Sequence, residues 1–303
     1  MPAVLTHTYG NSHYIKTPDG RQLHYMENGE GPVTVVFESG MGMSRSAWGL
    51  VQPVVAGYTR AVVYDRAGSG KSDADQAPRT LARMTDDLMC LLSHLGAGPF
   101  ILVGHSWGGP VVRTVASRNP AIIRGLVLVD PTDEHCGLYF EEASVKHFAK
   151  MNTLLPLLAR TGLYKLMGSK PGKVLPEDVY REQRQEDFTL QAAHTMVAEG
   201  AHFLQDLRAL LAHPLRLEGI EVSVLSGTLI TRMERNFRPS LHEAHRQTAA
   251  ELAHGRLVEA RHSGHMIMYS EPRLIADEIE RMIISSGLTA PYSPHNSSNA
   301  SGK

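Results

Sequence analysis

The sequence predicts an α/β fold, in which a mostly parallel, twisted sheet of about eight strands carries helices on both faces and an inserted helical cap. Three observations predict it. Segments rich in β-branched residues alternate with segments of helical spacing, several of the strand-like segments are apolar almost throughout, and one long interval interrupts this rhythm. A chain of 303 residues is long enough for one such domain with an insertion.

Six segments are rich in β-branched residues and are predicted to be strands: 33–40, 60–66, 100–106, 125–130, 221–227 and 256–262. Several of them are apolar almost without alternation, as expected for strands that are buried on both faces. The segments between them carry helical spacing, as in the run from Met84 to Leu95. Ahead of them, two further strand-like segments flank Asp19-Gly20, a pair typical of a tight hairpin turn. This hairpin predicts antiparallel strands at one edge of the sheet.

The long interval lies between the strands that end at Asp130 and begin at Glu221, about ninety residues where a simple crossover needs far fewer. Its Leu, Ala, Met, Glu and Arg content favours helices, with Pro171 and Pro176 between two halves. We therefore expect a core of residues 1–132 and 218–288 and a helical cap of residues 133–217. Residues 289–303 are polar and rich in Ser, Asn and Pro, so we expect a disordered tail.

Charge and composition limit the classes of partner that we expect for this protein. Thirty Lys and Arg residues against 31 Asp and Glu residues give a net charge of -1, without a basic block, so nucleic acid is not an expected partner. No segment resembles an export signal, and no run of eighteen apolar residues occurs. With only two cysteines, the sequence favours a soluble, cytoplasmic protein without a membrane partner.

The segment Gly104-His105-Ser106-Trp107-Gly108 follows a predicted strand directly and precedes a predicted helix. A turn this tight has no room for side chains at the two glycine positions, and it holds the serine in a strained conformation that exposes the hydroxyl. This pattern predicts Ser106 as a nucleophile.

A nucleophilic serine needs a base within hydrogen-bond reach, and the chain has 16 histidines. His265 lies just after the last predicted strand, where the carboxyl ends of parallel strands bring catalytic groups together. His262 is the alternative. The position of His265 favours it as the general base.

The order of the segments SGMG, YDRAGSGKSD, VGHSWGG, GLVLVDP and SGHMIMYSEP resembles the α/β-hydrolase superfamily. The resemblance runs from about residue 13 to residue 285 outside the cap. It implies a Ser106 nucleophile, a His265 base and an oxyanion hole made by the backbone N–H groups of Trp107 and Met41. Ser39 stands where this family usually has His. The turn from Asp65 to Ser72 is interpreted as structural.

The acid of the triad departs from the common pattern. Many members place it after the strand that here reads EVSVLSG, but the following loop holds only Glu234. Asp130 ends the strand beside that of the nucleophile, a position that some relatives use. The sequence favours Asp130 as the acid, with Asp133, Glu134 and Glu234 as alternatives.

Serine as the nucleophile excludes the mechanism of haloalkane dehalogenases and epoxide hydrolases, which use an Asp nucleophile. The expected reaction is hydrolysis of a carboxylic ester or lactone of a small, largely apolar or aromatic molecule through an acyl-enzyme. Carbon–carbon bond hydrolysis, perhydrolysis and a non-catalytic small-molecule receptor are the alternatives. The expected substrate pocket includes Gly40, Leu154, Leu158 and Met196. Without HExxH, CxxC or a GxGxxG that opens the first strand–helix unit, no metal or organic cofactor is expected.

Overall fold

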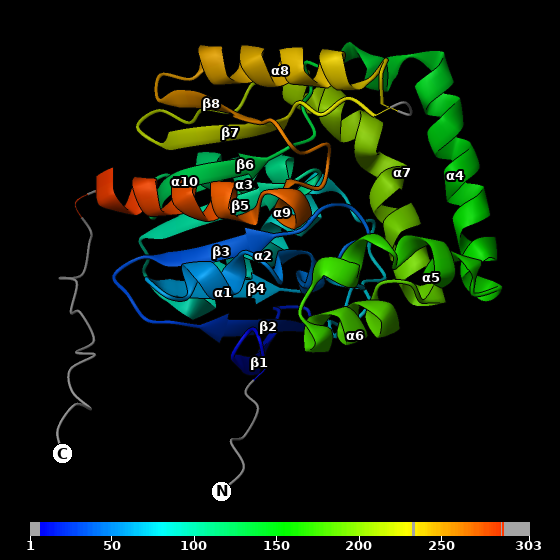
Figure 1. Ribbon diagram of the computed structural model, residues 1–303, viewed down its shortest axis with the longest axis horizontal. Coiled ribbons are helices and arrows are strands. Elements are labelled where there is room, and N and C mark those ends of the chain that lie inside the picture. Colours follow the sequence, from blue (N-terminus) through cyan, green and yellow to red (C-terminus); the bar gives the residue numbers. More distant parts are fainter. Residues whose placement is uncertain (1–6, 232–233, 286, 288–303) are drawn as a thin grey trace, which may run out of the picture.

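A computed structural model describes residues 7–231, 234–285 and 287 of the chain. Eight strands form one mixed sheet in the order β1-β2-β4-β3-β5-β6-β7-β8 (Figure 1). The strands are β1 Asn11–Lys16, β2 Gln22–Asn28, β3 Thr34–Glu38, β4 Arg60–Tyr64, β5 Phe100–His105, β6 Ile123–Val129, β7 Glu221–Gly227 and β8 Gly255–Ala260. The predicted fold class is confirmed.

Most neighbouring strands of the sheet are parallel. Strand β1 pairs antiparallel with β2, and β2 pairs antiparallel with β4, whereas every pair from β4-β3 to β7-β8 is parallel. The β1-β2 hairpin closes with a hydrogen bond from the Gly20 N–H to the Thr17 carbonyl at 2.9 Å, and Gly20 has a φ of 92°. The antiparallel edge expected around Asp19-Gly20 is therefore present.

Helices pack on both faces of this sheet (Figure 1). One face is covered by α2 Leu81–Leu95, α3 Gly108–Arg118 and α8 Arg238–Glu251, and the other by α1 Gln52–Val55 and α10 Pro272–Ser285, with α9 Ile267–Ser270 before α10. Short 3-10 turns lie at Arg45–Trp48, Gly137–Phe140 and Pro171–Val174. The two faces bury two separate hydrophobic clusters.

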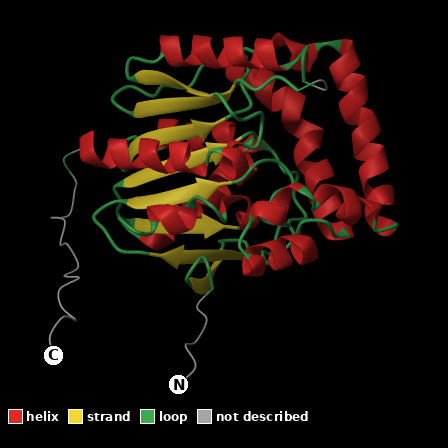
Figure 2. Ribbon diagram, viewed as in Figure 1, coloured by secondary structure: helices red, strands yellow, loops and turns green. Residues whose placement is uncertain are grey.

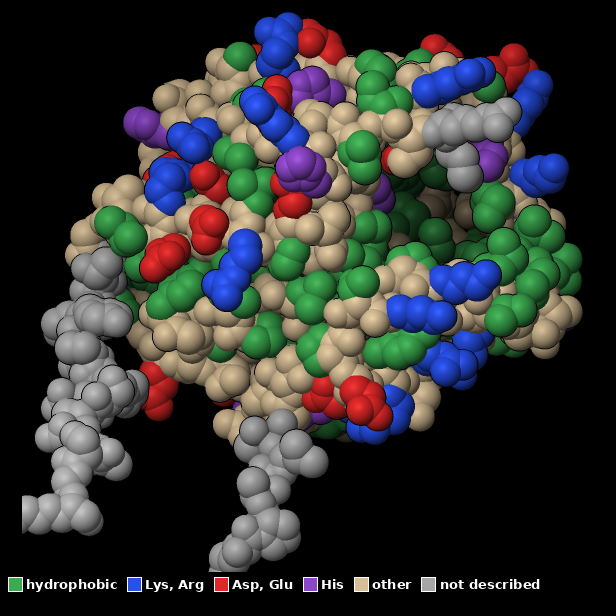
Figure 3. Space-filling view, in the orientation of Figure 1, with side chains coloured by type: hydrophobic (Ala, Val, Ile, Leu, Met, Phe, Trp, Pro, Cys, Tyr) green, Lys and Arg blue, Asp and Glu red, His purple; other side chains and the backbone are tan. Residues whose placement is uncertain are grey.

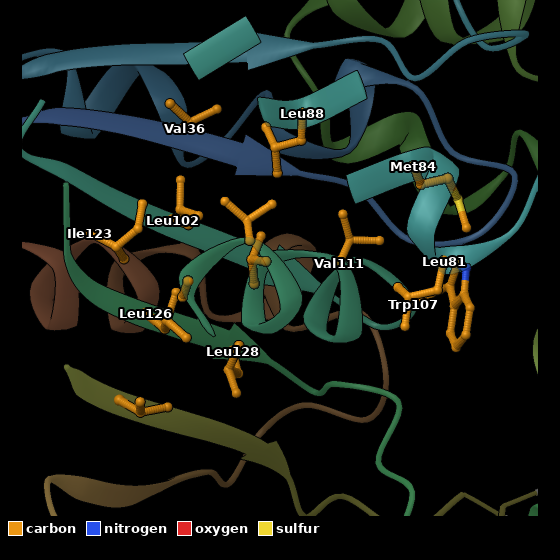
Figure 4. Packing of buried hydrophobic residues seen from close by; sticks show 14 of the residues in the cluster. Val36, Leu81, Met84, Leu88, Leu102, Trp107, Val111, Ile123, Leu126 and Leu128 are labelled. Carbon is orange, nitrogen blue, oxygen red and sulfur yellow. The ribbon is translucent and has the colours of Figure 1, made fainter. Parts of the chain in front are cut away.

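The central strand β5 shows why the sequence alternates so little. Phe100 and Leu102 face the cluster under α2 and α3, while Ile101 and Val103 face the cluster under α10, and all four are almost fully buried. A strand with a core on each side has no polar face. Figure 4 shows the first cluster, with Leu102 of β5 close to residues of α2, α3 and β6.

The interval between β6 and β7 folds into helices that lie over one end of the strands. They are α4 Glu142–Arg160, α5 Leu163–Gly168, α6 Glu177–Glu186 and α7 Leu190–Ala212. In Figure 2 most strand arrowheads point toward these helices, so the carboxyl ends of the parallel strands lie beneath them. We call these four helices the cap. The expected tail, residues 289–303, lies outside the described residues.

A buried arginine fastens the cap to the body of the protein. Arg45 is 1% exposed, and its guanidinium contacts Asp65 at 2.6 Å in the body and Glu182 at 2.5 Å and Glu186 at 2.8 Å on α6. Because burying a lone charge is costly, each of these groups requires the others. The cap is therefore held in a fixed place over the sheet edge.

Within the described residues, no helix combines the length and the apolar character that crossing a membrane requires.

Because β5 is buried, shortening one of its core side chains should lower the stability of the protein strongly. Leu102→Ala should lower the free energy of unfolding by roughly 2 to 5 kcal/mol, because Leu102 is fully buried and its removal leaves a cavity. Urea denaturation followed by circular dichroism measures this change. Leu211→Ala, at a side chain of α7 that is 46% exposed, is the matched control and should change it by less than about 0.5 kcal/mol. Equal losses in both variants would contradict the packing described.

Candidate active site

Ser106 lies in the sharp turn between β5 and α3. Its φ is 51°, a left-handed conformation that a non-glycine residue adopts at a cost of about 1 to 3 kcal/mol. A Cβ atom added to Gly104 would lie 2.6 Å from the Gly108 carbonyl oxygen. A Cβ atom added to Gly108 would lie 2.7 Å from the Glu38 carbonyl oxygen. Both positions therefore require glycine.

Neighbouring backbone holds this turn in place. The Ser106 N–H donates to the Val129 carbonyl at 3.1 Å, and the Ser106 carbonyl accepts from the N–H groups of Gly109 and Thr132, both at 2.9 Å. These bonds tie the turn to the end of β6 and to the segment after it. The strain at Ser106 is thus fixed from outside the turn.

Asp130 follows β6 directly and is fully buried. It too has a positive φ, 42°, and its N–H donates to the Leu225 carbonyl at 2.7 Å. The carboxylate oxygen Oδ1 accepts from the Gly227 N–H at 3.0 Å, and Oδ2 lies 2.7 Å from Nδ1 of His265. The structure thus brings Asp130 and His265 together from the ends of β6 and of the segment after β8.

The alternative residues are engaged elsewhere among the described residues. Asp133 contacts His135 and Thr248. Glu134 forms a bidentate salt bridge with Arg113, in which both N–O distances are 2.7 Å. The other candidate base, His262, is exposed, and its backbone N–H donates to Glu271. Of the four carboxylates considered from the sequence, Asp130 is the one that hydrogen-bonds to His265.

Arg238, at the start of α8, clamps the Asp130 carboxylate. Its Nη1 lies 2.7 Å from both Asp130 oxygens, and its Nη2 lies 2.6 Å from Oε1 of Glu234. Arg238 is 2% exposed, so little water screens these contacts. Glu234 is therefore a partner of the arginine that holds Asp130.

These contacts keep Asp130 ionised. Burial raises the pKa of the carboxyl group, but the hydrogen bond from His265 and the positive charges around it outweigh burial. The pKa of Asp130 is held well below its usual range. A carboxylate that stays charged can accept a hydrogen bond from the Nδ1–H of the imidazole at all physiological pH values.

His105, the residue before Ser106, supports His265 through a hydrogen bond and a ring contact. Its Nε2 lies 3.1 Å from the His265 carbonyl oxygen, and the two ring centroids are 4.6 Å apart. Burial, followed by the nearby His265, lowers the pKa of His105 to about 3. The ring is neutral, and because a carbonyl only accepts, Nε2 of His105 is its protonated nitrogen.

The loop after β3 approaches Ser106 closely. A Cβ atom on Gly40 would lie 2.8 Å from Nδ1 of His105 and 3.2 Å from the Ser106 Cβ, so a side chain there would enter the site. Met41 and Trp107 both line the same cavity as Ser106. No hydrogen bond between described residues uses the backbone N–H of either one.

A buried ion cluster fixes this loop to the cap. Arg66 is 2% exposed; it donates to the Ser39 carbonyl at 2.5 Å and the Gly40 carbonyl at 2.6 Å, and contacts Glu199 on α7 at 2.8 Å. Arg66 also pairs with Glu38. Glu199 in turn accepts from the Gly42 N–H at 3.2 Å. The turn that the sequence marks as structural thus supports the loop that carries Met41.

Ser106 and His265 open into a cavity of about 420 Å³ between the sheet edge and the cap. Figure 3 shows a hollow lined by hydrophobic side chains on this side of the molecule. The cavity is lined by Gly40, Met41, Met43, His105, Ser106, Trp107, Thr132, Tyr139, Phe148, Met196, Phe203, Glu234, Phe237, Arg238, Leu241 and His265.

The expected pocket residues divide in two. Gly40 and Met196 line the cavity, whereas Leu154 and Leu158 of α4 are not among its lining residues, and Leu154 is 37% exposed. Five aromatic side chains form much of its wall: Trp107, Tyr139, Phe148, Phe203 and Phe237. Trp107 and Phe203 pack with ring centroids 4.9 Å apart.

The sequence reasoning missed Arg238, His105 and Glu199. His105 could have been found from its position next to Ser106, on a strand whose end faces the site. Arg238 and Glu199 carry no local signal, because each acts on a partner more than a hundred residues away. Among the described residues, no group of three or more His, Cys, Asp or Glu side chains could hold a metal ion.

This geometry is that of a hydrolase site, and comparison with known proteins gives the family. The model of the alpha/beta hydrolase family matches residues 35–278, so the chain belongs to this family. The resemblance found in the sequence is confirmed.

Particular relatives differ in how much they share. An uncharacterised protein of Bacillus subtilis strain 168, YqjL, is 34% identical over 45% of this chain and 55% of its own length, so the chain matches only about half of that relative. A Caulobacter vibrioides protein (strain NA1000 / CB15N), RutD, whose name describes it provisionally as a carbamate hydrolase, is 30% identical over 70% of this chain and 77% of its own. The crystal structure of the Cif epoxide hydrolase from Acinetobacter nosocomialis superposes with a TM-score of 0.73 at 16% identity, covering 90% of this chain and 88% of that one, which shows the fold alone.

The charges around His265 predict how kcat/KM of this protein depends on pH. Asp130, Glu234, Arg238 and His105 face it from four different elements, and Glu234 interacts with it electrostatically. The negative charge of Glu234 favours the protonated form of His265 and partly cancels the positive charge of Arg238. The substitution Glu234→Gln removes this negative charge. The acidic limb of the kcat/KM profile of this variant should therefore move to lower pH. Stopped-flow or plate assays across pH 4 to 9 on a neutral substrate measure it.

Glu243→Gln serves as the matched control, since Glu243 forms an exposed pair with Arg246 on the same helix. Its profile should coincide with that of the wild type. An acidic limb of Glu234→Gln that stays in place or moves to higher pH would show that Glu234 does not act on the histidine.

Proposed function

We propose that this hydrolase cleaves a carboxylic ester or lactone of a small, largely apolar or aromatic molecule through an acyl-enzyme on Ser106. The observation that carries the proposal is the convergence of a strained Ser106, a His265 paired at 2.7 Å with a buried Asp130, and an aromatic wall in one cavity. Each of these groups has one step to perform.

The reaction begins at the serine hydroxyl. Since Nδ1 of His265 is engaged with Asp130, Nε2 is the nitrogen that takes the proton as Oγ of Ser106 attacks the carbonyl carbon. The carbon–oxygen bond to the alcohol then breaks, and the imidazolium returns the proton to the leaving oxygen. Water, deprotonated by the same nitrogen, attacks the acyl-enzyme and releases the carboxylic acid and the free serine.

The developing oxyanion needs donors already in place. The backbone N–H groups of Met41 and Trp107 are proposed for this role, since both residues line the cavity beside Ser106 and neither amide is used by another described residue. The N-terminal end of α3, directly after Ser106, adds a favourable dipole. Arg66 would serve this step indirectly, because it holds the carbonyls of Ser39 and Gly40.

Asp130 is proposed to orient His265 and to stabilise the imidazolium. Its buried oxygens are held by the Gly227 amide and by Arg238, so the carboxylate does not have to reorganise during the reaction. The positive φ of Asp130 supports this role, since backbone strain persists where the surrounding structure imposes it.

The cavity favours an apolar acyl or alcohol group. Its volume of about 420 Å³ is in the range of pockets that bind small organic molecules, and its wall is dominated by aromatic and Met side chains. Esters with an aromatic or medium-length alkyl group fit this wall better than charged ones, which would lose water without gaining a partner.

Carbamate hydrolysis is the second candidate. It is favoured by the 30% identity to RutD of Caulobacter vibrioides, and it requires the same attack of a serine on a carbonyl carbon. A matched panel of p-nitrophenyl esters, aryl lactones and p-nitrophenyl carbamates, ranked by kcat/KM, separates the two. The highest value on carbamates would replace the ester proposal.

The role of Asp130 predicts the effect of one isosteric change. Asp130→Asn should lower kcat on p-nitrophenyl butyrate by on the order of a thousandfold or more, because an amide does not stabilise the imidazolium or fix its tautomer. The initial rate of p-nitrophenolate release measures this loss.

Asp133→Asn provides the control, because Asp133 is an equally buried neighbour that contacts His135 and Thr248 instead. Its kcat should stay within tenfold of the wild type, and thermal unfolding should show that both variants are folded. Full activity of Asp130→Asn, together with loss of activity in Glu234→Gln, would assign the acid to Glu234.

A further inference from the structure

The cap exposes an unusual number of large hydrophobic side chains. Of the twelve such side chains that the described residues expose, seven lie in one stretch of 27 residues on α4, α5 and the following 3-10 turn. They are Phe148, Leu154, Leu157, Leu163, Leu166, Met167 and Val174, and Leu166 is 65% exposed. Exposed apolar side chains scattered singly need no explanation, but a concentration of this kind marks a binding surface.

The same stretch carries positive charge without negative charge. Lys150, Arg160, Lys165, Lys170 and Lys173 lie in it, and it contains no Asp or Glu. None of these five forms an ion pair within the described part of the chain, whereas Lys146, one turn earlier, pairs with Glu142. Their charges are therefore available to a partner.

Helices α4 and α5 lie against each other at the outer side of the cap (Figure 1). Figure 3 shows hydrophobic side chains gathered over this region, at the right-hand edge of the face, with Lys and Arg side chains beside them. Apolar and basic groups thus share one surface. We call residues 148–174 the cap surface.

We propose that the cap surface docks this enzyme peripherally on an anionic lipid bilayer. Leu and Met side chains that project from a helix can enter the boundary between headgroups and acyl chains, while neighbouring Lys and Arg side chains bind lipid phosphates. Each basic side chain near an anionic surface contributes about 1 kcal/mol, so five of them add substantially to the binding from apolar contact.

A second copy of this chain fits the cap surface less well. A symmetric dimer through this surface would bring five positive charges of one copy against five of the other, without acidic partners in the stretch. Nucleic acid would be attracted by the charges but would leave the Leu and Met side chains in water. An anionic bilayer satisfies both kinds of group.

The cap surface lies close to the cavity that contains Ser106. Phe148 lies on α4 and also lines the cavity above Ser106, and it packs on Phe203 at a centroid distance of 5.4 Å. The helix that meets the bilayer therefore also forms a wall of the cavity. An apolar molecule dissolved in the bilayer would have a short path to the site.

Vesicle binding tests the proposal without any need for catalysis. Full-length protein is sedimented with vesicles of phosphatidylcholine alone and with vesicles of equal parts phosphatidylcholine and phosphatidylglycerol. We expect binding to the second kind that weakens as salt is raised. The triple variant Leu157→Ser, Leu166→Ser, Met167→Ser should reduce the partition coefficient by roughly tenfold or more. Lys170→Gln with Lys173→Gln should reduce it by roughly twentyfold.

Controls come from exposed residues outside the cap surface. Leu211→Ser removes an exposed leucine of α7, and Arg124→Gln removes an exposed charge at the start of β6. Both should bind vesicles as the wild type does, and all variants should keep the wild-type melting temperature.

Three results would overturn the proposal: no binding to the anionic vesicles, binding that the triple variant leaves unchanged, or a lipid-free dimer in sedimentation velocity that the triple variant converts to a monomer. The last would assign the cap surface to self-association. Because these readouts do not involve Ser106, failure of the proposed ester hydrolysis would leave them unaffected.

Discussion

The buried negative charge of Asp130 is the constraint around which the site is arranged. A carboxylate with no access to water is stable only if hydrogen bonds and positive charge replace its hydration. Here the Gly227 amide, Arg238 and His265 do so, and they come from the end of β7, from α8 and from the segment after β8. Satisfying one charge therefore fixes three separate segments and, with them, the orientation of the histidine.

The same principle links the cap to the body. Arg66 neutralises Glu38 in the body and Glu199 on α7, and Arg45 does the same for Asp65 and for the acidic side chains of α6. Breaking either cluster would leave an uncompensated buried charge, at a cost of about 3 to 5 kcal/mol. The cap is consequently a fixed wall of the cavity, and the loop that carries Met41 is positioned by the same ions that hold the cap.

The features that could be predicted from the sequence are the local ones. The central strands are readable because a strand buried on both faces, such as β5, is apolar throughout, and the turn at Ser106 is readable because sterics demand Gly104 and Gly108. Arg238 and Glu199 were not predictable, since their partners lie 108 and 133 residues away. The aromatic wall and the cap surface are assembled from several helices. Without a long apolar run, the sequence predicted no membrane partner and gave no sign of a surface of this kind.

Covalent trapping tests the proposed role of Ser106 as a nucleophile activated by His265 and Asp130. The folded protein is treated with a fluorophosphonate, digested, and analysed by peptide mass spectrometry. We expect one adduct, on the peptide that contains Ser106. It should be absent from Ser106→Ala and from unfolded protein, and it should form far more slowly in Asp130→Asn. An unlabelled Ser106 in a protein that still hydrolyses esters, or an adduct on another residue that persists in Ser106→Ala, would contradict this role.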